Sequence, residues 1–129
     1  MPLYTIMTQR NYLDQARKAS LAGQLTNLHS EFSGVPTEWV HIVFQDFEPG
    51  SGFSAGLPAP TVSLTANIRS GRTNEYKREL LAHIWKLLQA ATNAPDDQIV
   101  IGLLEVGANN AMEMGKIMPD IARTTDVGP

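Results

Sequence analysis

The feature that most constrains this chain is an internal repeat, because sliding the sequence by 59 residues aligns its two halves. The shift places Leu3 on Val62 and Pro36 on Pro95. In each half a strand-like run is followed by a helical pattern and then by a second strand-like run. Self-similarity at such a period indicates two copies of one supersecondary unit, here βαβ. We therefore expect one domain over 1–129, with repeat one at about 2–47, repeat two at about 61–106, and a C-terminal segment at 107–129.

In the first half we expect a strand at 3–7, a helix ending near Phe32 and a strand at 39–44. Asn11 or Asp14 is a plausible helix N-cap, and Gly34 with Pro36 ends the helix. The apolar residues of this helix recur at spacings of four, three and four, so they share one face. The stretch 49–60 is rich in Gly, Pro and Ser and is expected to be a long loop.

The second half repeats this order, with a strand at 62–68, a helix that starts at Thr73 and a strand at 99–104. The parallel strands of each unit are joined by a crossover helix. These elements predict the α+β class, with a four-stranded sheet and both helices on one face. A parallel pair usually needs cover on both faces, and two helices cover only one. The bare face predicts oligomerisation, although a polar outer face would remove that need.

The composition of the chain excludes several classes of partner and of chemistry. The chain has 129 residues and a net charge of -3, and its Lys and Arg residues are scattered, so nucleic acid is not an expected partner. It has no cysteine, which excludes disulfides, thiolate nucleophiles and Cys-bound metals. No stretch approaches the roughly 20 apolar residues of a membrane span, and no secretory signal is evident. We expect a cytoplasmic protein without a membrane partner.

Pro2 is the first candidate for chemistry. A small residue after the initiator Met permits removal of Met1, which would leave Pro2 as an N-terminal secondary amine. Such an amine starts near the α-amino pKa of about 7.7–8.0, and burial or a nearby cation lowers its pKa toward that of a general base. Among carboxylates it would instead stay protonated and act as an acid. Many proteins begin Met-Pro without catalytic consequence, so this motif alone decides nothing.

Two arginines, Arg69 and Arg72, lie three residues apart where a predicted strand ends in a Gly turn. Their planar guanidinium groups match the two oxygens of a carboxylate. The alternative is a solvated strand-to-helix turn. His29 lies at the edge of the apolar face of the first helix, where a structural histidine is the simpler interpretation.

The remaining polar candidates are weaker. His41 and His83 are interpreted as ordinary residues, and no His-rich spacing predicts a metal site. Glu113 lies among methionines, where it is either a general base or water-activating group, or an exposed loop residue. Glu105 follows a strand and is a weaker candidate than Glu113.

Together these residues resemble the tautomerase superfamily, and within it the cis-3-chloroacrylic acid dehalogenase group more than the short 4-oxalocrotonate tautomerases. The resemblance spans about 2–119. It rests on four motifs in order, which are Pro2, His29 in Leu25-Thr26-Asn27-Leu28-His29, Ile68-Arg69-Ser70-Gly71-Arg72-Thr73, and Met112-Glu113-Met114-Gly115 ahead of Pro119. It implies the tautomerase fold, a homotrimer with active sites near subunit interfaces, and no metal or organic cofactor.

The resemblance also implies roles. His29, Arg69 and Arg72 would bind the carboxylate of a small substrate, Glu113 would activate water, and Pro2 would deliver a proton to the α-carbon. The reaction would be hydration of an α,β-unsaturated carboxylate, or its hydrolytic dehalogenation when the β-carbon carries halide. The dehalogenases have a tyrosine where this chain has Gly102. A keto-enol tautomerase acting on phenylpyruvate-like substrates and a noncatalytic trimeric ligand-binding protein are the alternatives.

Overall fold

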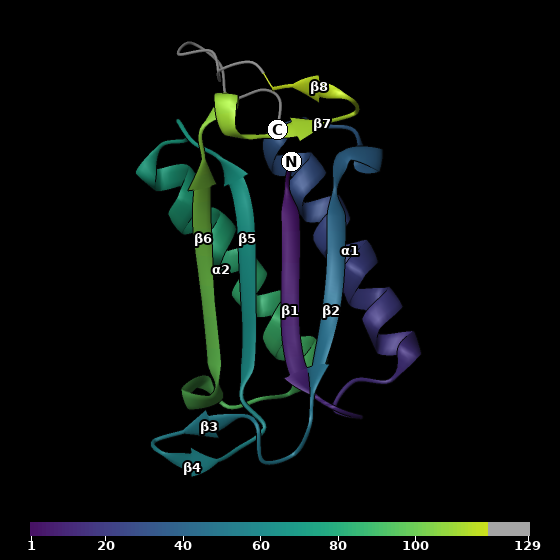
Figure 1. Ribbon diagram of the computed structural model, residues 1–129, viewed down its shortest axis with the longest axis vertical. Helices are drawn as coiled ribbons and strands as arrows, with labels where there is room; N and C mark the ends of the chain where they lie inside the picture. Colours follow the sequence, from purple (N-terminus) through teal and green to yellow (C-terminus); the bar gives the residue numbers. More distant parts are fainter. Residues whose placement is uncertain (119–129) are drawn as a thin grey trace.

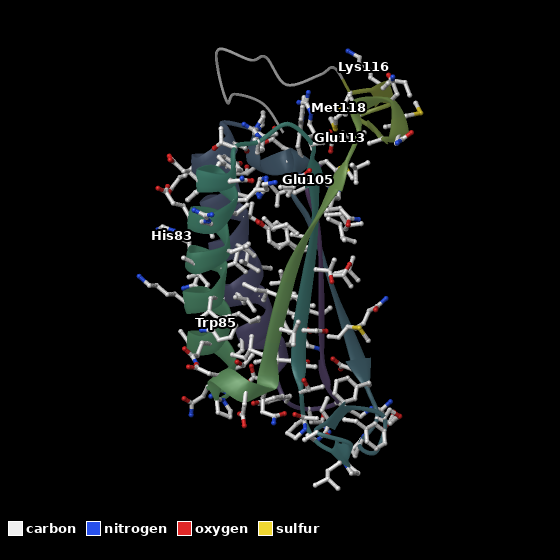
Figure 2. The ribbon with its side chains drawn as sticks, turned by 90° about the vertical axis from the view of Figure 1, so that its left-hand side faces the viewer. His83, Trp85, Glu105, Glu113, Lys116 and Met118 are labelled. Carbon is white, nitrogen blue, oxygen red and sulfur yellow. The ribbon has the colours of Figure 1, made fainter. Side chains whose placement is uncertain are left out.

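A computed structural model describes residues 1–118 and shows two layers, a four-stranded sheet and a pair of helices. Both helices lie against the same face of the sheet (Figures 1 and 2). The sheet consists of β1 (Leu3–Gln9), β2 (His41–Phe47), β5 (Val62–Arg69) and β6 (Ile99–Val106), in the order β2-β1-β5-β6. The pairs at the two edges are parallel, and the pair β1–β5 in the middle is antiparallel. The predicted α+β architecture of two tandem βαβ units is confirmed. The helix of the first unit is α1 (Gln15–Ser33) and that of the second is α2 (Asn74–Thr92).

The repeat extends beyond the βαβ units. The helices α1 and α2 are related by the same shift of 59 residues, and so are two short hairpins that follow the second strand of each unit. The hairpins lie at opposite ends of the sheet (Figure 1). Each turns through two residues with positive φ, Ala55 and Gly56 in one and Met114 and Gly115 in the other, the pattern of a two-residue type I′ turn. Their strands are β3 (Phe53–Ser54), β4 (Leu57–Pro58), β7 (Met112–Glu113) and β8 (Lys116–Ile117).

The helix boundaries follow from their caps. The Asp14 carboxylate accepts the backbone N–H of Arg17 at 2.8 Å, so Asp14 rather than Asn11 is the N-cap of α1. Gly34 ends α1 in the left-handed region with φ 75°. In α2 the N-cap is Thr73, whose hydroxyl accepts the N–H of Tyr76 at 3.1 Å.

The core fills the space between sheet and helices. Alternate residues of β1 and β5 point into it, and both helices contribute leucine and isoleucine, as the period of 3.6 predicts. The opposite face of the sheet carries large apolar side chains that are 39 to 67% exposed. A monomer rarely leaves such a face bare, which agrees with the expected oligomer. The exposed residues on that face are Met7, Val43, Val100 and Leu104.

Two local predictions are wrong. The second strand begins at His41, not Trp39. Pro36 is the N-cap of a short 3-10 helix, η1 (Thr37–Trp39), and Trp39 is its last residue. The stretch 49–60 is not a plain loop, since it contains the β3–β4 hairpin.

No helix among residues 1–118 has both the length and the apolar character to cross a membrane. Of the C-terminal segment predicted at 107–129, residues 119–129 lie outside the described part.

Candidate functional site

The topology brings the candidate residues to one end of the sheet. Because β1 runs antiparallel to β5 and β6, the N-terminus meets the carboxyl ends of those two strands there (Figure 1). The same end receives the C-terminal part of α1, which carries His29, and the first turn of α2. Pro2 is buried at this point, and its carbonyl accepts the backbone N–H of His41 at 3.1 Å. Residues from both repeats therefore converge on the start of the chain.

Glu113 reaches the N-terminus from the β7–β8 hairpin. The hairpin turn at Met114 and Gly115 follows directly after Glu113, and Figure 2 places Glu113 at the top of the sheet beside this hairpin. One carboxylate oxygen, Oε2, contacts the α-ammonium group of Met1. The other, Oε1, is buried and has no hydrogen-bond partner within residues 1–118. An amine and a carboxyl in contact can exchange a proton, which suits acid-base chemistry.

The electrostatics of the N-terminal amine are unusual. The pKa of the Met1 amine falls from 8.0 to about 6, chiefly because burial disfavours the charged form and secondly because the Arg69 cation is near. An amine of this pKa is mostly a free base at neutral pH. The pocket thus keeps more of an N-terminal amine in the neutral form, and hydrates it less, than an exposed position would.

The two arginines are withdrawn from water. Arg69 is 4% exposed at the end of β5, and Arg72 is 6% exposed just before α2. Gly71 joins them with φ 106°, a conformation that side-chain-bearing residues rarely adopt. The guanidinium carbon of Arg72 lies 4.8 Å from the centre of the Tyr76 ring, a cation–π arrangement that holds the group in place. Two buried cations at one end of a sheet favour an anion there.

His29 is part of the same cluster. Its side chain is buried at 2% exposure, and its Nδ1 lies 2.8 Å from the Tyr4 hydroxyl. The pKa of His29 falls to about 3, first through burial and then through the positive charges of Arg72 and the N-terminal amine. These two charges act on the ring because they are close to it. His29 is therefore neutral at physiological pH.

A cavity of about 660 Å³ opens beside Pro2 on the side of the bare sheet face. Its walls include Pro2, Val43 and Glu113, and also His41, which the sequence analysis treats as an ordinary strand residue. The imidazole Nδ1 of His41 lies 3.1 Å from the Trp39 carbonyl. The volume is in the range of small-molecule sites, so Pro2 and Glu113 share one accessible space.

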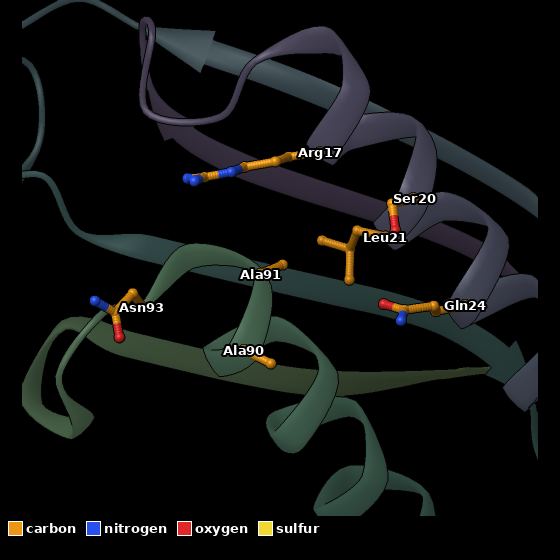
Figure 3. A pocket seen from close by; sticks show the side chains of 7 residues that line it. All are labelled: Arg17, Ser20, Leu21, Gln24, Ala90, Ala91 and Asn93. Atoms are coloured by element: carbon orange, nitrogen blue, oxygen red, sulfur yellow. The ribbon is translucent and has the colours of Figure 1, made fainter.

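A second cavity, of about 440 Å³, lies between α1 and α2 and contains none of the candidate residues. Figure 3 shows it flanked by Arg17, Ser20 and Gln24 of α1 and by Ala90 and Ala91 of α2. Arg17 and Ser20 are exposed to solvent. The groove offers no buried polar group to a ligand.

The weaker candidates lie outside the cluster. Glu105 binds the Lys77 ammonium at 2.5 Å. His83 lies on the outer side of α2 (Figure 2) against the Phe32 ring, with the centroids 5.3 Å apart. Among the residues described, no group of three or more His, Asp or Glu side chains is arranged to hold a metal ion. A Cβ built on Gly102 meets nothing within 4 Å, so this position of β6 leaves open space.

Sequence reasoning missed Tyr4, Tyr76 and His41. Tyr4 is the most informative of these, because it lies on the inward face of β1, where a phenol needs a partner for its hydroxyl. That requirement was readable from the strand alternation, but the identity of the partner was not.

Comparison with known proteins identifies a matching family and similar solved structures. Residues 1–126 match a family model described as "Putative oxalocrotonate tautomerase enzyme". The chain is 32% identical to the solved structure of N1, a member of the cis-3-chloroacrylic acid dehalogenase family, with a TM-score of 0.86 over 92% of this chain and 84% of that one. It is also 32% identical to native Ps01740, with a TM-score of 0.83 over 86% and 99% of the two chains.

A symmetric trimer of a fused 4-OT shares the fold, with a TM-score of 0.81 at 17% identity over 90% of this chain and 94% of that one. A search of curated proteins found no match.

Proposed function

Because this chain belongs to the tautomerase superfamily, we propose that it is an enzyme whose catalyst is the secondary amine of Pro2. Removal of Met1 would expose that amine in the pocket where the Met1 amine now contacts Glu113. Burial and the Arg69 cation would act on it in the same direction. The contact between an N-terminal amine and Glu113 is the observation that carries the proposal.

The substrate we propose is a small α,β-unsaturated carboxylate. Its carboxylate would be bound by Arg69 and Arg72, whose planar groups donate paired hydrogen bonds, and by neutral His29. The support is that all three side chains are buried at the end of the sheet where Pro2 lies. Because these groups are largely withdrawn from water, their attraction for an anion is stronger than at an exposed surface.

The reaction we propose is addition of water across the double bond. The Glu113 carboxylate takes a proton from water, the water oxygen bonds to the β-carbon, and the protonated Pro2 amine gives its proton to the α-carbon. With halide on the β-carbon, the halohydrin product collapses to an aldehyde with loss of halide and a proton. The 32% identity to a member of the cis-3-chloroacrylic acid dehalogenase family supports this chemistry.

A second function, keto-enol tautomerisation, is favoured by a different observation. The lowered pKa of the N-terminal amine makes a free base at neutral pH, and a free base can move a proton between an enol oxygen and carbon. In that reaction Glu113 has no water to activate. The need for Glu113 therefore separates the two functions, because only water addition needs a carboxylate to accept a proton from the nucleophile.

We further propose that the enzyme is a homotrimer. The support is the exposed apolar face of the sheet and the trimeric assembly named for a fused 4-OT of the same fold. The cavity beside Pro2 opens on that face, since Val43 belongs to both. A neighbouring subunit would therefore help to enclose the substrate.

The test is Glu113→Gln, which keeps size and hydrogen bonding but removes basicity. Hydration of a 3-halo acrylate or propiolate should fall by about 10²-fold or more, while ketonisation of phenylpyruvate should fall far less. Pro2→Ala, which loses the ring amine, should reduce both. Hydration that survives in Glu113→Gln but not in Pro2→Ala would remove the water-activating role of Glu113 and with it the dehalogenase-like assignment, leaving a tautomerase with Pro2 as its one catalytic residue. If neither variant changes either rate, Pro2 and Glu113 have no part in the reaction and the proposal fails. A natively folded protein with neither activity would be a noncatalytic ligand-binding protein.

A further inference from the structure

Tyr4 is a fully buried tyrosine on a central strand, and its hydroxyl is hydrogen-bonded to a histidine. The Tyr4 oxygen lies 2.8 Å from Nδ1 of His29, and the two rings meet edge to face with centroids 5.6 Å apart. Within residues 1–118 this is the only hydrogen bond of either side chain. Neither ring is exposed by more than 2%. The pair is therefore fixed both by packing and by a single hydrogen bond.

The direction of this hydrogen bond follows from counting protons. The Tyr4 hydroxyl has one proton to donate, and His29 Nδ1 is the acceptor within reach. Had Nδ1 carried the ring proton, the tyrosine proton would be buried without an acceptor among residues 1–118, which is costly. The hydroxyl therefore donates to Nδ1. A neutral imidazole that accepts at Nδ1 carries its proton at Nε2.

We propose that Tyr4 is a positioning residue that fixes His29 as the Nε2–H tautomer, so that His29 offers a substrate carboxylate a neutral hydrogen-bond donor. The inference rests on the proposed function for its ligand, but the tautomer itself does not depend on any substrate. In the proposed complex Nε2 faces the carboxylate, so the opposite tautomer would present a lone pair to the anion and repel it.

A neutral donor also fits the charge balance of the pocket. Arg69 and Arg72 already supply two cations beside the N-terminal amine. A third cation at His29 would disfavour the protonated amine that water addition requires. Burial keeps His29 uncharged, and its pKa of about 3 agrees with that state. Tyr4 thus adds a directed donor to the site without adding charge.

Nitrogen NMR of the ¹⁵N-labelled protein without substrate tests the tautomer directly. We expect Nδ1 of His29 to resonate as a pyridine-type nitrogen and Nε2 as a pyrrole-type nitrogen at pH 7. A pyrrole-type Nδ1 would overturn the inference. Because no substrate is present, this result is independent of whether Pro2 is the catalyst. His41 and His83 give separate signals, and their absence in the single Gln variants assigns the spectrum.

Kinetics test whether Tyr4 acts through His29. Tyr4→Phe should raise KM for the carboxylate substrate by about 3- to 10-fold, the effect of one neutral hydrogen bond, with a smaller effect on kcat. In a His29→Phe background, Tyr4→Phe should add nothing. Tyr12→Phe removes a hydroxyl from a half-buried tyrosine packed on the same core and is the matched control.

An equal loss in both backgrounds, or a loss in kcat with KM unchanged, would show that Tyr4 does not position His29. If Tyr4→Phe does not fold, the tautomer measured in the unmodified protein decides. Unchanged catalysis in Pro2→Ala would defeat the proposed function alone and leave the NMR assignment standing.

Discussion

Replacing Arg72 by Ala is the sharpest probe of the proposed anion site. Arg72 is 6% exposed and is held 4.8 Å from the Tyr76 ring, so its hydrogen bonds to a carboxylate would be little screened by water. Charge-assisted hydrogen bonds contribute about 1.5–3 kcal/mol. At about 1.4 kcal/mol for each factor of ten, kcat/KM for a carboxylate substrate should fall by about 10- to 150-fold, chiefly through KM.

The assay compares a 3-halo acrylate with its uncharged amide. The unmodified enzyme should prefer the carboxylate, and Arg72→Ala should lose most of that preference because the amide never used the cation. Arg72→Lys keeps the charge but not the paired donors, so it should fall between the two. Arg78→Ala, at an exposed position of α2, is the control. Unchanged kcat/KM in a natively folded Arg72→Ala protein would show that Arg72 belongs to a structural turn.

Three further outcomes follow from the same structure. In kcat/KM profiles, hydration, for which we propose a protonated Pro2, should decline as pH rises through the pKa of the Pro2 amine, which burial and the Arg69 cation should lower as they lower the pKa of the Met1 amine. Tautomerisation, for which we propose the free amine, should rise over the same range; opposite limbs would reverse the roles. The pKa of His29 falls from 6.5 to about 3 on folding, so the contribution of His29 to stability against urea should be complete above pH 6.5 and should be lost as the pH falls toward 3. His29→Gln should flatten that decline, and His83→Gln should not. Light scattering should give the mass of three chains at micromolar concentration, whereas a monomeric mass would contradict the proposed interface.

Much of the fold was predictable because its signals are local. The alternation in β5 and the period of 3.6 in α2 identify their elements directly, and Thr73 and Gly34 mark helix ends by the conformations they favour. The shift of 59 residues then transfers each assignment to the other half. The hairpins could not be predicted, because the turn of one contains Ala55 at positive φ, and alanine has little preference for that conformation.

The site was predictable as a set of residues but not as a geometry. Sequence spacing indicates that Arg69 and Arg72 are neighbours, since only a Gly turn separates them. The contact of Glu113 with the N-terminus spans almost the whole chain, and the Tyr4–His29 hydrogen bond spans 25 residues. Both contacts depend on the antiparallel pairing of β1 with β5, through which the first strands of the two repeats run in opposite directions. No local pattern encodes that pairing.

The central claim is that a free Pro2 amine is the catalyst, and a removable N-terminal tag tests it most directly. With the tag attached, residue 2 is an amide nitrogen that can neither accept nor deliver a proton. Cleavage that leaves Pro2 as the first residue, verified by intact mass, should create hydratase or tautomerase activity that the tagged chain lacks. Equal activity before and after cleavage would contradict the account, because the amine would then have no part in the reaction.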